Sequence, residues 1–273
     1  MGVAVNKEGF LEWCPQKSRF DSHRTSKKDD EFYHKVRDLE NKVNVKVVLF
    51  GTSYVRNLRI ENNKVLIWDK YFHSLFAYNM GVGGDTVTDT QSRIKCAPFE
   101  RKTHRQLHTV FIHSGSNDAT IHSALQIAEG IMYCAIIAVQ KCPFIKVVIS
   151  ALIPRKKPKP HCSIHGMDEN MVIAEVNILL KKFCDGSPFH LMVNWENVEL
   201  GLYCKEDDVH LSVAGNRRFA KQIKLSIEGV TKVKYVPSTS PEAAEYLVFA
   251  ARAYATTDFR GTYHLFFIVL QKT

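Results

Sequence analysis

The sequence predicts an α/β fold, a three-layer α/β/α sandwich built on a five-stranded parallel sheet. Short aliphatic and β-branched runs recur along the chain, and amphipathic stretches of helix length separate them. Strands that are apolar on both faces and alternate with helices belong to parallel sheets that helices cover on both sides. The predicted strands are residues 46–50, 75–80, 109–113, 145–153 and 189–194.

The predicted helices lie between these strands. They begin near Ser53 and near Asp85, and the later ones span residues 121–141, 167–183 and 213–228. In open parallel sheets, ligands bind at the carboxyl ends of the strands, in the loops that follow them. Functional residues are therefore expected in the loops after the strands.

The domain organisation follows from where this pattern starts and stops. Residues 1–42 are predicted to be a polar N-terminal arm with a short helix, and residues 43–230 to form the main domain. Residues 231–273 are predicted to be a C-terminal appendage of unknown role, because two prolines and several small hydroxyl residues interrupt the pattern there. This appendage either docks on the main domain as a helix and strand or has no catalytic consequence.

The composition is that of a folded globular protein, with 45% hydrophobic and 24% charged residues. The longest uncharged apolar run, residues 131–139, is shorter than the roughly 20 residues that span a bilayer, and the N-terminus has no secretory hydrophobic region. The seven cysteines form an odd set without a C-x-x-C pair. This pattern is typical of a reducing compartment, so the expected localisation is cytoplasmic.

The charge is basic, with 37 Lys and Arg against 28 Asp and Glu and a net charge of +9. One cluster, the basic loop Arg155, Lys156, Lys157 and Lys159, follows the fourth predicted strand and is expected to face outward. We predict that it steers an anionic substrate or membrane surface toward the site. The alternatives are ordinary solvated surface, which most basic clusters are, and attraction to nucleic acid.

Two candidate segments follow the first and second predicted strands. Ser53 stands at a strand end with a helix behind it, where helix N–H groups favour negative charge, so it is a candidate nucleophile. Taken alone, it is more often a helix N-cap. Residues 81–84 are rich in glycine and can expose N–H donors, but they match neither nucleotide-binding motif, and an ordinary tight turn explains them equally well.

Two further segments complete the set. Asn117 follows the third strand and can offer its amide as an oxyanion donor, although asparagine is also a routine turn residue. Asp207 and His210 lie three residues apart, so one helical turn would let the carboxylate orient the imidazole as a general base, while Asp208 would point elsewhere. Alone, this segment could equally be a surface histidine beside acids.

The order Ser, Gly, Asn and Asp-x-x-His after successive strands resembles the SGNH (GDSL-like) hydrolase family, over roughly residues 45–227. The stretches NMGVGGDT, LIPRKKPKP and DVHLSVAGNRRFAK are most similar to the catalytic subunits of intracellular platelet-activating-factor acetylhydrolases. This resemblance implies a flavodoxin-like fold and no metal or organic cofactor. It further implies the triad Ser53, Asp207 and His210, an oxyanion hole of Ser53, Gly84 and Asn117, and a homodimer or heterodimer as the assembly.

The sequence thus predicts a serine esterase for a short acyl group, in the first place acetyl, with a phospholipid-like substrate as one option. Thr52 stands where the family usually has Asp, so the acid that helps to brace the nucleophile's turn is missing. The alternative is therefore a catalytically weakened module of the same fold that binds anionic lipid or nucleic acid, with nucleic acid the less favoured partner. An α/β-hydrolase is disfavoured because G-x-S-x-G is absent.

Overall fold

The structure is a computed structural model. The residues that it describes are 4–5, 11–12, 25–59, 67–99, 106–160, 167–185, 187–192, 200–203 and 207–232. Nearly all of the predicted C-terminal appendage, from residue 233 onward, lies outside them. Close to the N-terminus, β1 (Ala4–Val5) and β2 (Leu11–Glu12) form a small antiparallel pair.

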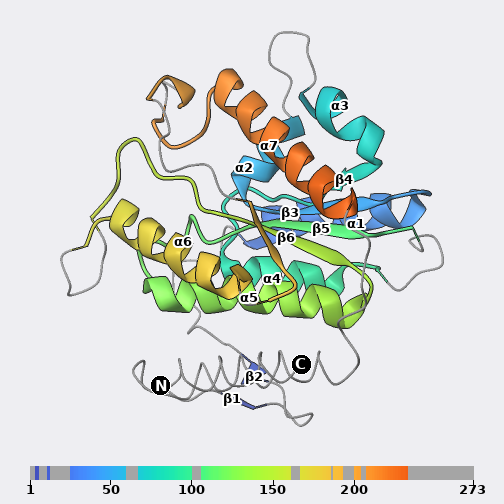
Figure 1. The fold of residues 1–273 in the computed structure, drawn as a ribbon, viewed down its shortest axis with the longest axis horizontal. Coiled ribbons are helices and arrows are strands. Elements are labelled where there is room, and N and C mark those ends of the chain that lie inside the picture. Colours follow the sequence, from blue (N-terminus) through green and yellow to red (C-terminus); the bar gives the residue numbers. More distant parts are fainter. Residues whose placement is uncertain are drawn as a thin grey trace.

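The central sheet has five parallel strands in the order β4-β3-β5-β6-β7, which confirms the predicted fold class (Figure 1). Each predicted strand run overlaps one of them, although β4, β6 and β7 are shorter than the runs that predicted them. The strands are β3 (Val47–Gly51), β4 (Ala77–Asn79), β5 (Thr109–His113), β6 (Lys146–Ser150) and β7 (His190–Met192).

Helices cover both faces of this sheet (Figure 1). Because successive side chains of a strand point to opposite faces, Val48 and Phe50 of β3 join one core while Val47 and Leu49 join the other. The first core is closed by α4 (Val87–Cys96), α5 (Ala124–Lys141) and α6 (Glu169–Asp185). The second is closed by α2 (Ser53–Arg56), α3 (Ile67–Phe72) and α7 (Val213–Lys232).

Local sequence explains where two of these helices begin. The Ser123 hydroxyl accepts the backbone N–H of Gln126 while the Gln126 side chain accepts the N–H of Ser123, a capping box that starts α5 at Ala124, three residues later than predicted. A similar box with Thr86 starts α4. The short 3₁₀ helices are η1 (Asn57–Arg59), η2 (His73–Leu75) and η4 (Leu200–Leu202).

The predicted polar N-terminal arm needs a correction. Instead of a short helix, α1 (Thr25–Asn41) is 17 residues long, and it buries Phe32 and Leu39 in the same core as α4 to α6. These apolar residues stand seven apart, on one face of the helix, so a mostly polar sequence hides a narrow packing stripe. Helix α1 is therefore part of the main domain, whose start was predicted too late at residue 43.

Among the described residues, no helix combines the length and apolar character needed to cross a membrane.

Candidate active site

The candidate site lies where the strand order of the sheet reverses. From β3 the chain moves outward to β4 and then returns to β5 on the other side of β3, so the carboxyl ends of β3 and β5 form a topological switch point. Ser53 comes two residues after the end of β3, and Asn117 four residues after the end of β5. The predicted residues thus gather at the edge where this fold class binds ligands.

Gly51 allows the two strand ends to come together. Its φ is +155°, and a Cβ at this position would lie 2.3 Å from the carbonyl oxygen of His113, which also accepts the backbone N–H of Thr52 at 3.2 Å. Only glycine fits so close an approach. The backbone before Ser53 is therefore held against the end of β5.

Ser53 is the first residue of α2 and does not cap it. The N-cap is Thr52, in an extended conformation and without a side-chain capping bond. The Ser53 hydroxyl instead lies 2.8 Å from Nε2 of His210, and only 8% of the residue is exposed. The helix-cap alternative for Ser53 is therefore wrong, and its side chain is available for chemistry.

The other ring nitrogen of His210 contacts Asp207. Nδ1 lies 2.5 Å from Oδ2 of Asp207, while Oδ1 of the same carboxylate accepts the backbone N–H groups of Val209 and His210, each at 2.9 Å. Partial burial by itself raises the pKa of Asp207, but the bonds from His210 and Val209 outweigh it and lower this pKa to about 2. The charged form of Asp207 is thus favoured where its carboxylate contacts the imidazole.

The segment 207–210 is not the helical turn that the sequence suggested, although the predicted contact of Asp207 with His210 is present. Asp208 has a left-handed φ of +53°, which breaks any helix there. Its carboxylate points away from His210 and forms ion pairs with both Lys156 and Lys157. These two bonds lower the pKa of Asp208, so the two neighbouring acids have separate partners.

The basic loop, residues 155–159, differs from its prediction. Arg155 does not face outward as predicted but is buried, where its guanidinium donates to Glu169 at 3.0 Å and to the carbonyl oxygen of Ser116 at 2.9 Å. Of the four cations, Lys157 and Lys159 are the exposed ones. The predicted outward-facing cluster is therefore wrong for Arg155.

Arg155 instead belongs to a hydrogen-bond network that supports the turn before His210. The sequence did not reveal this network. Nη1 of Arg155 donates to the hydroxyl of Tyr54 at 3.3 Å, and this hydroxyl donates to the carbonyl oxygen of Val209 at 2.7 Å. Tyr54 directly follows Ser53, so one buried side chain connects α2 to the turn that carries His210. No sequence pattern marks such a long-range contact.

The predicted oxyanion donors Gly84 and Asn117 are connected through Asp85. Gly84 has a φ of +74°, and the Asn117 amide donates one hydrogen bond, 2.8 Å long, to the carbonyl oxygen of Asp85. The Asp85 carboxylate forms two bonds with Arg93, at 2.5 and 2.9 Å. Burial raises the pKa of Asp85 to about 6, against the opposing effect of Arg93.

Thr52 contributes no bond in place of the missing acid. Its hydroxyl is buried, with 1% of the residue exposed, and has no hydrogen-bond partner within the part of the chain that the structure describes. Within the same described ranges, no cluster of three or more His, Cys, Asp or Glu side chains is arranged to hold a metal ion.

Comparison with known proteins gives one relative in sequence. No protein-family model matches the chain. Over 115 residues it is 30% identical to platelet-activating factor acetylhydrolase IB subunit alpha1 of Bos taurus. The match covers 42% of this chain and 46% of the relative, so the chain spans about half the length of the curated relative it matches.

Solved structures extend the comparison to the whole domain. A GDSL-like lipase of Bacteroides thetaiotaomicron matches with a TM-score of 0.56 and 18% identity, over 74% of this chain and 97% of that one. A carbohydrate acetylesterase of Sinorhizobium meliloti matches with a TM-score of 0.51 and 15% identity, over 68% and 99% of the two chains. At these identities the likeness concerns the fold. The resemblance inferred from the sequence is thus confirmed: the chain has the fold of the GDSL-like, or SGNH, hydrolases.

Proposed function

We propose that this protein is a serine esterase that hydrolyses short-chain esters through an acyl-enzyme intermediate. The observation that carries the proposal is the continuous chain of contacts from Asp207 through His210 to Ser53, at the switch point of an SGNH-type sheet. Ser53 is the nucleophile, His210 the general base, and Asp207 the acid that orients the imidazole.

The first half-reaction forms the acyl-enzyme. The Ser53 oxygen attacks the ester carbonyl carbon while its proton passes to Nε2 of His210, and the carbonyl π electrons move to the oxygen. The resulting imidazolium is stabilised by Asp207, whose low pKa keeps it ionised. Collapse of the tetrahedral species expels the alkoxide, which takes the proton from His210. Water then repeats the sequence and releases the carboxylic acid.

The oxyanion would be stabilised by three N–H groups. The N–H of Ser53 stands in the first turn of α2, where helix N–H groups have no acceptor within the helix. The backbone N–H of Gly84 is the second donor. The Asn117 amide has two hydrogens, so its bond to Asp85 leaves one for the oxyanion.

Acetyl is the acyl group we propose first, because the chain resembles an acetylhydrolase subunit in sequence and an acetylesterase in fold. A phospholipid-like alcohol part remains part of the proposal. The alternative, a weakened module for anionic lipid or nucleic acid, has Thr52 in its favour. It has less support from the basic loop, because Arg155 is buried and two of the lysines are paired with Asp208.

The test is hydrolysis of nitrophenyl esters from acetyl to octanoyl, combined with intact-mass detection of a fluorophosphonate adduct. We expect turnover that falls with acyl length, one adduct on the wild type, and neither turnover nor adduct for Ser53→Ala. Ser92→Ala, which changes an exposed serine on α4, is the matched control and should behave as wild type. Folded wild-type protein without turnover or adduct would overturn the proposal and favour the binding module.

A further inference from the structure

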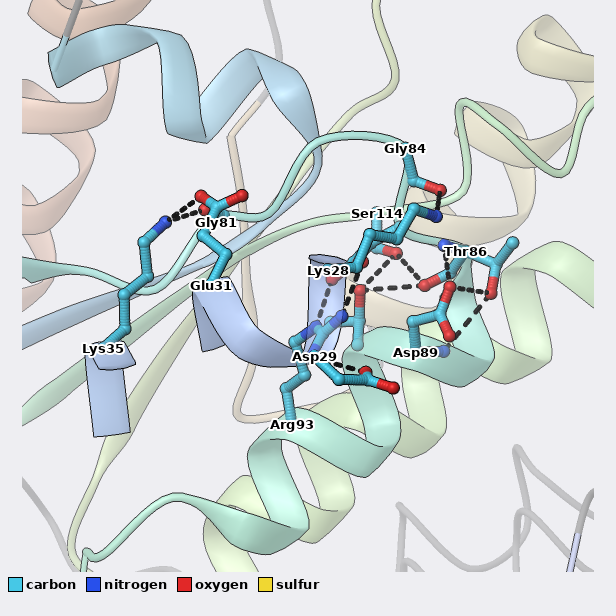
Figure 2. Close-up of polar contacts among 12 residues, drawn as sticks. Lys28, Asp29, Glu31, Lys35, Gly81, Gly84, Thr86, Asp89, Arg93 and Ser114 are labelled. Carbon is cyan, nitrogen blue, oxygen red and sulfur yellow. Dashed lines mark hydrogen bonds and ion pairs between the residues drawn. The ribbon is translucent and has the colours of Figure 1, made fainter. Parts of the chain in front are cut away.

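One face of α1 lies against the glycine loop, residues 81–84, that carries a proposed oxyanion donor. Figure 2 shows Lys28 and Lys35 of α1 reaching the loop, with Arg93 of α4 beside them. Lys28 and Lys35 are seven residues apart, two helical turns, and so share a face of α1. The sequence placed the same residues in a polar N-terminal arm outside the main domain.

Lys28 binds the C-terminal end of the glycine loop. Its ammonium nitrogen donates a 2.6 Å hydrogen bond to the carbonyl oxygen of Gly84. A Cβ on Gly84 would lie 3.2 Å from Cε and Nζ of Lys28, closer than ordinary contact. The lysine therefore packs on the left-handed Gly84 as well as binding it.

Lys35 binds the N-terminal end of the glycine loop. Its ammonium donates to the carbonyl oxygen of Gly81 and pairs with Glu31 at 2.8 Å. The Lys35 side chain is only 16% exposed, and burial lowers its pKa, although Glu31 acts in the opposite direction. A buried ammonium is costly unless it is well bonded, so this contact constrains the position of Gly81.

A third connection runs through Arg93. This arginine binds the Asp85 carboxylate, lies 4.6 Å from the ring centre of Phe32, and has Asp29 at 3.7 Å. Asp85 in turn accepts the Asn117 amide through its carbonyl oxygen. Contacts that start on α1 thus reach the loop of Gly84 directly and the side chain of Asn117 indirectly.

We infer that α1 is a working part of the active site, in which Lys28 and Lys35 are positioning residues that fix the glycine loop so that the Gly84 N–H faces the oxyanion. The inference rests on the proposed esterase function. A donor lowers the barrier only if it is already aligned before charge develops, and a run of glycines has little conformational preference of its own. Bonds from Gly81 N–H to Asn79 Oδ1 and from Val82 N–H to the Gly51 carbonyl oxygen hold the start of the loop, and the two lysine bonds add constraints at Gly81 and at Gly84 itself.

The test compares Lys28→Met, Lys35→Met and the double variant with Lys27→Met as the matched control. Methionine retains an apolar stem and removes the ammonium, and Lys27 is an exposed neighbour on the same helix. For each variant we would measure kcat and KM for nitrophenyl acetate and the inhibition constant of a short alkyl trifluoromethyl ketone. The Ser53 oxygen adds to the carbonyl carbon of this ketone while the serine proton passes to His210. The oxyanion that forms then lies in the proposed hole.

We expect kcat to fall about 10-fold for Lys28→Met and about 100-fold for the double variant, which reaches only the lower end of the 10²–10³-fold loss that removal of a whole donor costs. The inhibition constant should rise in the same proportion, while KM stays within about twofold. Lys28→Arg, which keeps a donor, should recover part of the loss. If the lysines only stabilised the fold, their replacement would lower thermal stability. It would not change kcat and the inhibition constant of the ketone in proportion.

Three outcomes would overturn the inference. Variants that match Lys27→Met in kcat and in ketone inhibition would show that the lysines do not position the loop. A change in KM alone would make Lys28 a substrate contact instead. A wild type without turnover or fluorophosphonate adduct would remove the proposed function and the inference with it. If Lys35→Met does not fold, the partly exposed Lys28 decides the result alone.

Discussion

Asp207→Asn is the most informative change at the site, because the two carboxylate oxygens have different tasks. Oδ2 contacts the imidazole at 2.5 Å, while Oδ1 accepts two backbone N–H groups. Asparagine has only one acceptor oxygen, so the second position must be taken by its NH₂ group. The substitution therefore has to lose one of the two sets of bonds.

The bond count decides which set is lost. If the Asn oxygen faces the backbone, it satisfies both N–H groups and turns the NH₂ toward Nδ1 of His210. Nδ1 must then be the unprotonated acceptor and Nε2 carries the hydrogen, which is the tautomer that cannot take the Ser53 proton. The opposite rotamer would keep the tautomer but set an NH₂ group against two backbone donors. We therefore expect turnover to fall by up to about 10⁴-fold, as for the wrong tautomer in a serine triad.

Asp208→Asn is the matched control, since it makes the same chemical change one residue away. Asn tolerates the left-handed conformation of Asp208, so the turn should survive. The variant loses the ion pairs to Lys156 and Lys157 but no contact with His210. We expect kcat within about threefold of wild type, because the lost ion pairs join Asp208 to the 155–159 loop and not to the imidazole.

The assay is kcat and KM for nitrophenyl acetate, with circular dichroism to establish that both variants are folded. A loss for Asp208→Asn that is larger than the loss for Asp207→Asn would refute the assignment of the triad acid. Equal, small losses would show that the imidazole is oriented without either carboxylate.

Three further predictions concern stability. Burial raises the pKa of Asp118 to about 7, from about 4 in an unfolded chain, so its stabilising contribution is complete below about pH 4 and is lost as the pH rises through about 7. Asp118→Asn should thus gain more stability over wild type in urea denaturation at about pH 8 than at about pH 5, and equal gains would contradict the assignment. Gly51→Ala should lower the free energy of unfolding by more than about 2 kcal/mol, because its Cβ would meet the His113 oxygen at 2.3 Å, whereas Gly229→Ala, which meets nothing within 4 Å, should stabilise α7. Thr52→Val should raise stability by about 1 kcal/mol in thermal denaturation, because it removes a buried hydroxyl without a partner; a clear loss would mean that this hydroxyl is bonded in solution.

The sequence by itself determined the sheet and the loops in which the candidate site residues stand. Strand runs that are apolar on both faces and alternate with amphipathic stretches of helix length predict a parallel sheet, because helices must cover both of its faces. Their carboxyl ends in turn mark the loops where Ser53, Gly84 and Asn117 stand. The contact of Asp207 with His210 was predicted from a helical turn, and it is present although the segment is not helical.

Only the tertiary structure decided what surrounds these residues. Helix α1 was missed as a packing element because its apolar stripe is narrow and its lysines look like solvated surface in the sequence. Arg155 was also assigned to the surface, because a basic residue among lysines looks solvated in the sequence. In the structure its guanidinium donates hydrogen bonds to a buried glutamate and to a tyrosine hydroxyl. The burial of a charged side chain depends on partners far away in the chain, Tyr54 with Val209 or Lys28 with Gly84. Local sequence patterns carry no record of such partners, because the fold alone brings them together.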